Sequence, residues 1–149
     1  MPAKNSPALA DTLPMEREVT ITRIFDAPRA AIWHAWTDPD EAAAWWHPEG
    51  VVTPRDSVEL DVRPGGSYRY TMIDPKGGKY PTGGVYHEVV EPERLVFGAA
   101  TVTFTDLGDG RSEMVFHTTV DMPDDVLRTA TGGLSTAFDR LTHHLERRT

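Results

Sequence analysis

The residue with the clearest potential for chemistry is Glu88, which stands between Tyr86 and Val90 in a segment that alternates like a β-strand. If the face that carries Tyr86 points inward, the Glu88 carboxylate is enclosed and can hydrogen-bond a ligand or act as an acid or base. A second interpretation stays open. A β-bulge turns Glu88 outward, or Glu88 forms a structural bond to a nearby tyrosine, arginine or backbone amide. The neighbouring His87 points to the opposite face of a strand, so the two residues do not form a catalytic dyad.

The histidines show no spacing that is typical of a metal site. His143 and His144 point about 100° apart on a helix, and His47 lies in a loop before proline and glycine. The HExxH pattern is absent, and each histidine is expected to be solvated or packed, so we predict neither metal nor cofactor. The segment that begins at Gly133 and holds Ser135 resembles the GxSxG elbow of hydrolases, but it lacks the last glycine and a preceding strand. The histidines are His34, His47, His87, His117, His143 and His144.

Aromatic and large apolar side chains recur at alternating positions of several expected strands and on one face of the last expected helix. Such side chains either fill a solid core or line a cavity between sheet and helix. Ligand pockets are mostly apolar with a few placed polar groups, and this set combines tryptophan, tyrosine and one glutamate. We therefore predict that the set binds a ligand. Its members are Trp45, Trp46, Tyr68, Tyr70, Met72, Tyr86, Glu88, Phe97, Phe104, Phe116, Leu134 and Phe138.

Hydrophobic periodicity predicts an α+β fold with one strand, two short helices, six strands and one long C-terminal helix. A period of two on both sides of Gly65-Gly66 predicts a hairpin. Asp38 is expected to cap the second short helix, and Gly132-Gly133 in the long helix indicates close packing against the sheet or a bend. Strands joined by short turns form a curved antiparallel sheet, and the long helix covers its apolar face. The strands are expected near residues 16–25, 52–62, 67–73, 84–91, 94–99, 100–106 and 112–120, and the helices over residues 28–36, 38–46 and 123–147.

Composition restricts the partners. The chain has 149 residues, a formal net charge of -8 and no cysteine. The acidic balance argues against nucleic acid and anionic membranes, and the absence of cysteine excludes disulfides and fits a reducing compartment. No apolar run reaches the ~20 residues of a membrane span, and the N-terminus does not resemble a signal peptide, so the cytoplasm is the expected location. We expect a disordered tail over residues 1–15 and one domain over residues 16–149.

Four segments carry a family resemblance. They read DAPRAAIWHAWTDPDEAAAWWHPEG, ELDVRPGGSYRYTM, GGVYHEVVEPERLVF and GGLSTAFDRLTHHL, and they span about residues 16–147 in order. The chain resembles the family of homologues of the activator of heat shock protein 90 ATPase. That family belongs to the START-like, SRPBCC or birch-pollen-allergen-like superfamily. The resemblance implies a helix-grip fold, in which a curved sheet wraps around the C-terminal helix, and a cavity between them. It does not imply one shared reaction.

Three functions remain as alternatives. The aromatic interior and the lack of a catalytic constellation favour binding of a small apolar or aromatic molecule, lipid-like ligands included. The resemblance also allows an enzyme of the cyclase, aromatase or hydrolase type, in which Glu88 and Tyr86 are the acid–base candidates. The family name allows a regulator of a chaperone ATPase with a role in the stress response. The eukaryotic activators carry an additional N-terminal domain, so the family name indicates the fold more than the partner.

Overall fold

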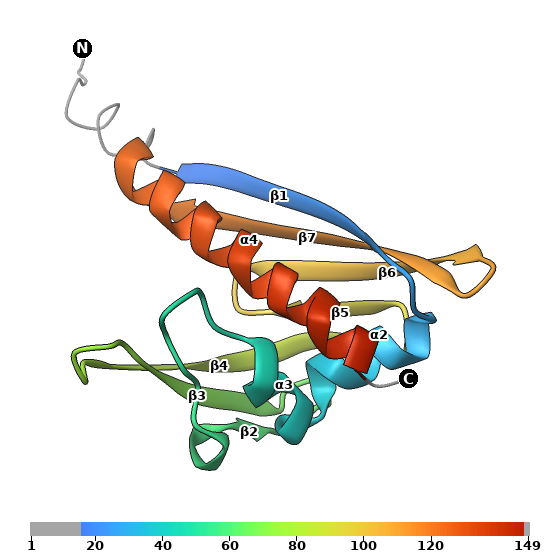
Figure 1. Cartoon of the computed structure of the whole chain (residues 1–149), viewed down its shortest axis with the longest axis horizontal. Coiled ribbons are helices and arrows are strands. Elements are labelled where there is room, and N and C mark those ends of the chain that lie inside the picture. The colour runs from blue at the N-terminus through green and yellow to red at the C-terminus, as the bar shows by residue number, and fades with distance from the viewer. Residues whose placement is uncertain (1–15, 148–149) are drawn as a thin grey trace.

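The computed structural model describes residues 16–147, so the expected tail over residues 1–15 lies outside the described residues. The predicted order of elements is confirmed (Figure 1). None of the described helices is long and apolar enough to cross a membrane. In chain order the elements are β1 (Glu16–Phe25), α2 (Arg29–Thr37), α3 (Pro39–Trp45), the 3-10 turn η2 (Arg55–Ser57), β2 (Glu59–Leu60), β3 (Ser67–Ile73), β4 (Lys79–Val90), β5 (Arg94–Phe97), β6 (Ala100–Gly108), β7 (Arg111–Asp121) and α4 (Asp124–Arg147).

The strands form one seven-stranded sheet in the order β1-β7-β6-β5-β4-β3-β2. All neighbouring strands are antiparallel, as expected for strands that follow one another through short turns. The first strand returns to the end of the sheet and pairs along its whole length with β7, from Glu16 opposite Asp121 to Phe25 opposite Ser112. The long helix α4 runs across one face of this sheet (Figure 1). The α+β fold with a curved antiparallel sheet and a C-terminal helix is therefore confirmed.

The expected strand over residues 52–62 is mostly absent. Val52 forms only an isolated bridge with Ile73, and the chain then turns through η2 before the two residues of β2. Pro54 explains the interruption because it has no N–H to donate to a neighbouring strand. The Ser57 hydroxyl makes hydrogen bonds to the backbone where strand pairing is absent. It donates to the Pro54 carbonyl at 2.7 Å and accepts from the Thr71 N–H at 3.1 Å. The predicted hairpin is therefore present only next to its turn, where Glu59 pairs with Arg69 and Leu60 with Tyr68.

Asp38 joins the two short helices. It ends α2, and its side chain accepts a hydrogen bond from the Asp40 N–H at 2.8 Å, so the predicted cap of α3 is confirmed. Pro39 occupies the first turn of α3, where its missing N–H costs nothing. The two helices bury Trp36 and Trp45, whose ring centroids lie 4.9 Å apart.

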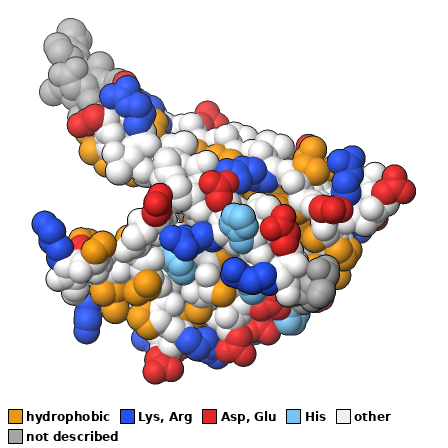
Figure 2. Space-filling view, viewed as in Figure 1, with side chains coloured by type: hydrophobic (Ala, Val, Ile, Leu, Met, Phe, Trp, Pro, Cys, Tyr) orange, Lys and Arg blue, Asp and Glu red, His pale blue; other side chains and the backbone are white. Residues whose placement is uncertain are grey.

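The long helix packs tightly over its second half only. Phe138, Leu141 and Leu145 are buried against the core, which also holds Trp36 and Phe116. The apolar positions nearer the start of α4 are only partly buried. In the space-filling view the molecule is hollowed between this first half of α4 and the hairpin of β3 and β4 (Figure 2). The predicted apolar stripe thus covers the core over half its length and faces an open hollow over the rest.

Candidate ligand-binding groove

A small aromatic pocket lies where β3, β4 and β5 approach the two short helices. Its volume is about 50 Å³, which is room for water, whereas a benzene-sized ligand occupies a cavity of about 150 Å³. The rings around it touch one another: the Tyr68 centroid lies 5.5 Å from Tyr86 and 5.5 Å from Phe97. Much of the chamber predicted from the sequence is therefore filled by its own side chains. The lining residues are Trp36, Ala42, Trp45, Trp46, Thr53, Val58, Leu60, Tyr68, Tyr70, Tyr86, Leu95 and Phe97.

The tyrosines of this pocket are held in the neutral form. Burial raises the pKa of Tyr86 and, to a smaller extent, that of Tyr68. Burial also raises the pKa of Tyr70, although hydrogen bonds with Trp46 and Thr82 partly oppose the shift. These hydroxyls therefore keep their protons at neutral pH and can donate hydrogen bonds.

A larger open groove lies beside the aromatic pocket, between the first half of α4, the loop after α3 and strand β3. Its volume is about 470 Å³, within the range of about 300–1,000 Å³ that is typical of ligand sites. The lining is apolar except for a few side chains at the loop and on the helix. The lining residues are Trp46, His47, Pro48, Glu49, Met72, Thr129, Ala130, Gly133, Leu134 and Ala137.

The loop that follows α3 forms one wall of the groove and contacts α4 at two positions, through Pro48 and Glu49. The Glu49 N–H donates to the Thr136 hydroxyl at 3.2 Å. At Gly133 the helix has no side chain, and a Cβ placed there would lie 3.3 Å from the Pro48 Cβ. The close packing predicted for the paired glycines is thus found at Gly133, but its partner is this loop and not the sheet. The glycine allows the loop to approach the helix axis and form one end of the groove.

Trp46 separates the groove from the aromatic pocket, because its ring lines both. The residue directly follows α3 as its C-cap, and its carbonyl accepts a hydrogen bond from the Thr53 hydroxyl at 2.7 Å. Its ring packs edge-on against Trp45 at 5.3 Å and against Tyr70 at 6.2 Å. Trp46 is the one described residue that the two linings share.

The structure divides the predicted binding residues into three groups. Trp45, Trp46, Tyr68, Tyr70, Tyr86 and Phe97 line the aromatic pocket. Trp46, Met72 and Leu134 line the groove. Phe104, Phe116 and Phe138 line neither space; they are buried behind the pocket, with their rings 6.4, 6.3 and 6.2 Å from Trp36.

Glu88 lines neither the aromatic pocket nor the groove. Its side chain is 47% exposed and accepts a hydrogen bond from the Arg94 Nε at 2.7 Å. The cause is a β-bulge between Tyr86 and Glu88. A bulge shifts the alternation of the strand by one residue, so Val89 packs on the core in place of Glu88. Of the two interpretations of Glu88 left open by the sequence, the outward-facing one is therefore correct.

Two unpaired basic side chains were not predicted: His47, which lines the groove, and the partly buried Arg140 near it. His47 Nδ1 and Arg140 Nε are buried and have no hydrogen-bond partner among the described residues. Burial lowers the pKa of His47, and the nearby positive charge of Arg140 lowers it further. The sequence around His47, a tryptophan before it and a proline after it, gives no signal of such a site. The unpaired ring nitrogen is recognised only in the fold, where His47 lies near Arg140, some 90 residues later in the chain.

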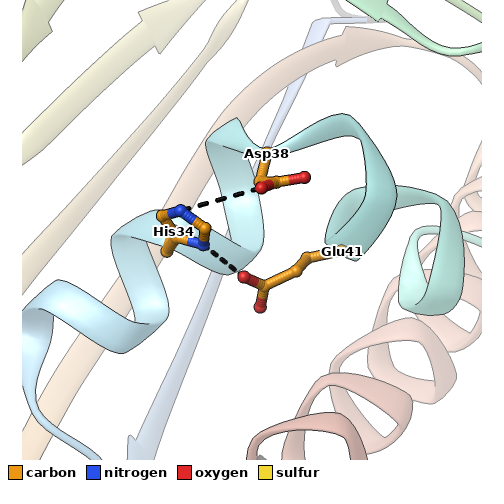
Figure 3. Close-up of side chains that lie close together, drawn as sticks. All are labelled: His34, Asp38 and Glu41. Atoms are coloured by element: carbon orange, nitrogen blue, oxygen red, sulfur yellow. Dashed lines mark hydrogen bonds and ion pairs between the residues drawn. The ribbon is translucent and has the colours of Figure 1, made fainter.

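A cluster of His34, Asp38 and Glu41 lies where α2 meets α3 (Figure 3). One ring nitrogen of His34 faces Asp38 Oδ2 at 3.7 Å, and the other hydrogen-bonds Glu41 Oε2. The second Glu41 oxygen pairs with His144 Nε2 of α4 at 2.9 Å. Side chains of these types can coordinate a divalent cation, and their i, i+4, i+7 spacing was not recognised in the sequence. As arranged, they bond to one another, and Glu41 connects α2, α3 and α4.

The family comparison covers most of the chain. A family model described as activator of Hsp90 ATPase homolog 1-like protein matches residues 26–146. Among curated proteins, none matches this sequence.

Several solved structures share the fold. A Nitrosomonas europaea protein is 21% identical with a TM-score of 0.78, and the match covers 89% of this chain and 96% of that protein. A Mycobacterium smegmatis protein is 27% identical with a TM-score of 0.75 over 93% of this chain and 94% of that one. A Silicibacter pomeroyi protein of the same family is 20% identical, with a TM-score of 0.72 over 89% of this chain and all of that one. These likenesses confirm the helix-grip fold.

Proposed function

The chain belongs to the family described as activator of Hsp90 ATPase homolog 1-like proteins, and on this premise we propose that it binds a small apolar or aromatic molecule in the groove beside α4. The observation that carries the proposal is an open, mostly apolar space of about 470 Å³ at the point where the sheet and the C-terminal helix part. The aromatic pocket is too small to hold such a ligand without movement of Trp46.

The expected affinity is moderate. Burying about 150–250 Å² of an aromatic ligand at about 25 cal/mol per Å² contributes roughly 4–6 kcal/mol. This corresponds to dissociation constants from about 1 mM down to tens of micromolar. A ligand that also moves Trp46 and enters the aromatic pocket would bury more surface and bind more tightly.

The test is ligand-observed NMR together with thermal shift, using a panel of apolar and aromatic compounds. Leu134→Trp fills the groove, and Val126→Trp adds the same ring to the same helix at a position that is 48% exposed and outside the groove. We expect binding to the natural protein and to Val126→Trp, and loss of binding in Leu134→Trp. Equal binding by both variants, or no binding by the natural protein, would contradict the proposal.

The family description supports a second candidate, which is stimulation of a chaperone ATPase. An ATPase assay of the chaperone with and without the chain tests it, and an unchanged rate rejects it. We propose no reaction for the chain, because Glu88, the residue on which catalysis would rest, pairs with Arg94 away from the groove.

A further inference from the structure

We propose that the ligand of the groove is an amphipathic monoanion, and that its carboxylate binds between His47 and Arg140 while its apolar part lies against Trp46, Met72 and Leu134. This inference rests on the proposed function and adds the chemical class of the ligand. It follows from two buried nitrogen atoms without hydrogen-bond partners among the described residues: Nδ1 of His47, which lines the groove, and Nε of Arg140, which lies near His47 on α4.

His47 is the first of these side chains. It lines the groove and is only 8% exposed, yet its Nδ1 has no hydrogen-bond partner among residues 16–147. Its backbone N–H donates to the Trp45 carbonyl at 2.8 Å, and two residues later the Glu49 N–H holds the same loop on α4. Buried polar atoms are nearly always hydrogen-bonded in native proteins, so an unpaired ring nitrogen on the wall of a groove indicates a missing partner.

Arg140 is the second. It is partly buried on α4, one turn beyond the Thr136 that holds the loop, and its charge acts on His47. Its Nε is unpaired, and the guanidinium forms no ion pair with any carboxylate in the described part of the chain. A partly buried charge without a counter-ion is unfavourable, and a bound anion would supply one.

Several described arginines lack an ion pair, but Arg140 is the one among them whose Nε is buried without a hydrogen-bond partner. The arginines of the described range that pair with a carboxylate are Arg17, Arg23, Arg55, Arg63, Arg69 and Arg94. In the space-filling view, basic, histidine and acidic side chains lie together beside the inner end of the hollow (Figure 2).

Two acidic side chains bear on the charge of the ligand. Glu49 stands exposed at the rim, and Glu41 reaches His144, one turn from Arg140. These carboxylates oppose a high negative charge at the site. One guanidinium with one imidazole therefore suits a single negative charge, as on a carboxylate, better than a doubly charged phosphate.

The experiment compares 2-naphthoate with its neutral analogue 2-naphthamide by titration calorimetry on the full chain. The two probes have nearly the same shape, so their difference reports the charge. We expect the natural protein to bind naphthoate about tenfold more tightly, since hydrogen bonds to charged groups exceed neutral ones by about that factor. Nitrogen-detected NMR should show the His47 ring signals shifting with naphthoate and not with naphthamide.

Arg140→Met keeps the apolar stem and removes the charge, and Arg128→Met makes the same change at an exposed position earlier in α4. We expect Arg140→Met to abolish the preference for naphthoate, to retain naphthamide binding, and to melt no lower than the natural protein. Arg128→Met should keep the preference.

The outcomes separate the two proposals. If neither probe binds in the groove, the proposed function fails. If both bind with equal affinity, or if Arg140→Met keeps the preference for naphthoate, the groove binds apolar ligands and the carboxylate site is refuted. A lower melting temperature of ligand-free Arg140→Met would also count against it, because it would show that Arg140 already has a stabilising partner within the protein.

Discussion

The two adjacent glycines in α4 allow a matched test of how the loop packs on the helix. Both lie in a continuous helix, so alanine relieves the same conformational cost at each position. Their surroundings differ. A Cβ at Gly132 would meet nothing within 4 Å, whereas a Cβ at Gly133 would lie 3.3 Å from the Pro48 Cβ. The substitutions Gly132→Ala and Gly133→Ala therefore differ only in this one contact.

The magnitudes follow from this contact. Gly132→Ala should raise the free energy of unfolding by about 0.5–1 kcal/mol through helix propensity and reduced freedom of the unfolded chain. Gly133→Ala should gain the same free energy of unfolding from helix propensity. However, its methyl group must displace Pro48 and the loop by a few tenths of an ångström. Overpacking in a well-packed region costs about 1–3 kcal/mol. We therefore expect a net change between zero and a loss of about 2 kcal/mol.

Urea unfolding at constant pH measures both variants, with the melting temperature as a second readout. For a protein of this size, about 1 kcal/mol corresponds to roughly 2–4 °C. The two variants should differ in sign or by at least about 0.5 kcal/mol. Equal stabilisation by both would show that the loop at Pro48 does not pack on Gly133, and the assignment of the groove wall would then be wrong.

Three further predictions concern single side chains. Glu88→Gln should leave ligand binding unchanged and alter stability by less than about 0.5 kcal/mol, because the residue is exposed outside the groove. The pKa of His47 is lowered in the folded state, so the unfolded protein binds the proton more readily as the pH falls. The free energy of unfolding should therefore decrease below about pH 6.5. Denaturant unfolding should show a smaller decrease for His47→Gln than for the natural protein. Glu41→Gln should lower the free energy of unfolding by about 1–2 kcal/mol, because Glu41 bonds His34 and His144 across three helices.

The Glu41 and His47 predictions each have a matched control variant. Asp40→Asn alters an exposed carboxylate next to Glu41 that pairs with Arg55, and it should change stability much less. For the pH experiment, His87→Gln removes an exposed histidine and should keep the natural pH profile. A loss of ligand binding in Glu88→Gln would show that the bulge places this residue in the site after all.

The sequence by itself determined the elements and their order, because these depend on local interactions. Asp38 before Pro39 predicted the start of the second helix, and the structure confirms it. Alternation around Gly65-Gly66 predicted a hairpin, of which the structure confirms the two pairs nearest the turn, Glu59 with Arg69 and Leu60 with Tyr68. The apolar residues of the long helix indicated which face covers the sheet. The strand expected over residues 52–62 was wrong for a reason that is also local. Pro54 lies inside it, and proline is rarely found within a continuously paired strand.

Only the tertiary structure decided which side chains face the site. A single extra residue in β4 turned Glu88 outward and Val89 inward, and alternation alone does not reveal such a shift of register. The groove likewise depends on a loop near Pro48 meeting a helix at Gly133, and the unpaired atoms of His47 and Arg140 appear only when these distant segments meet. Contacts between residues far apart in the chain are set by the packing of the whole fold, so the sequence specified the parts and the packing specified the site.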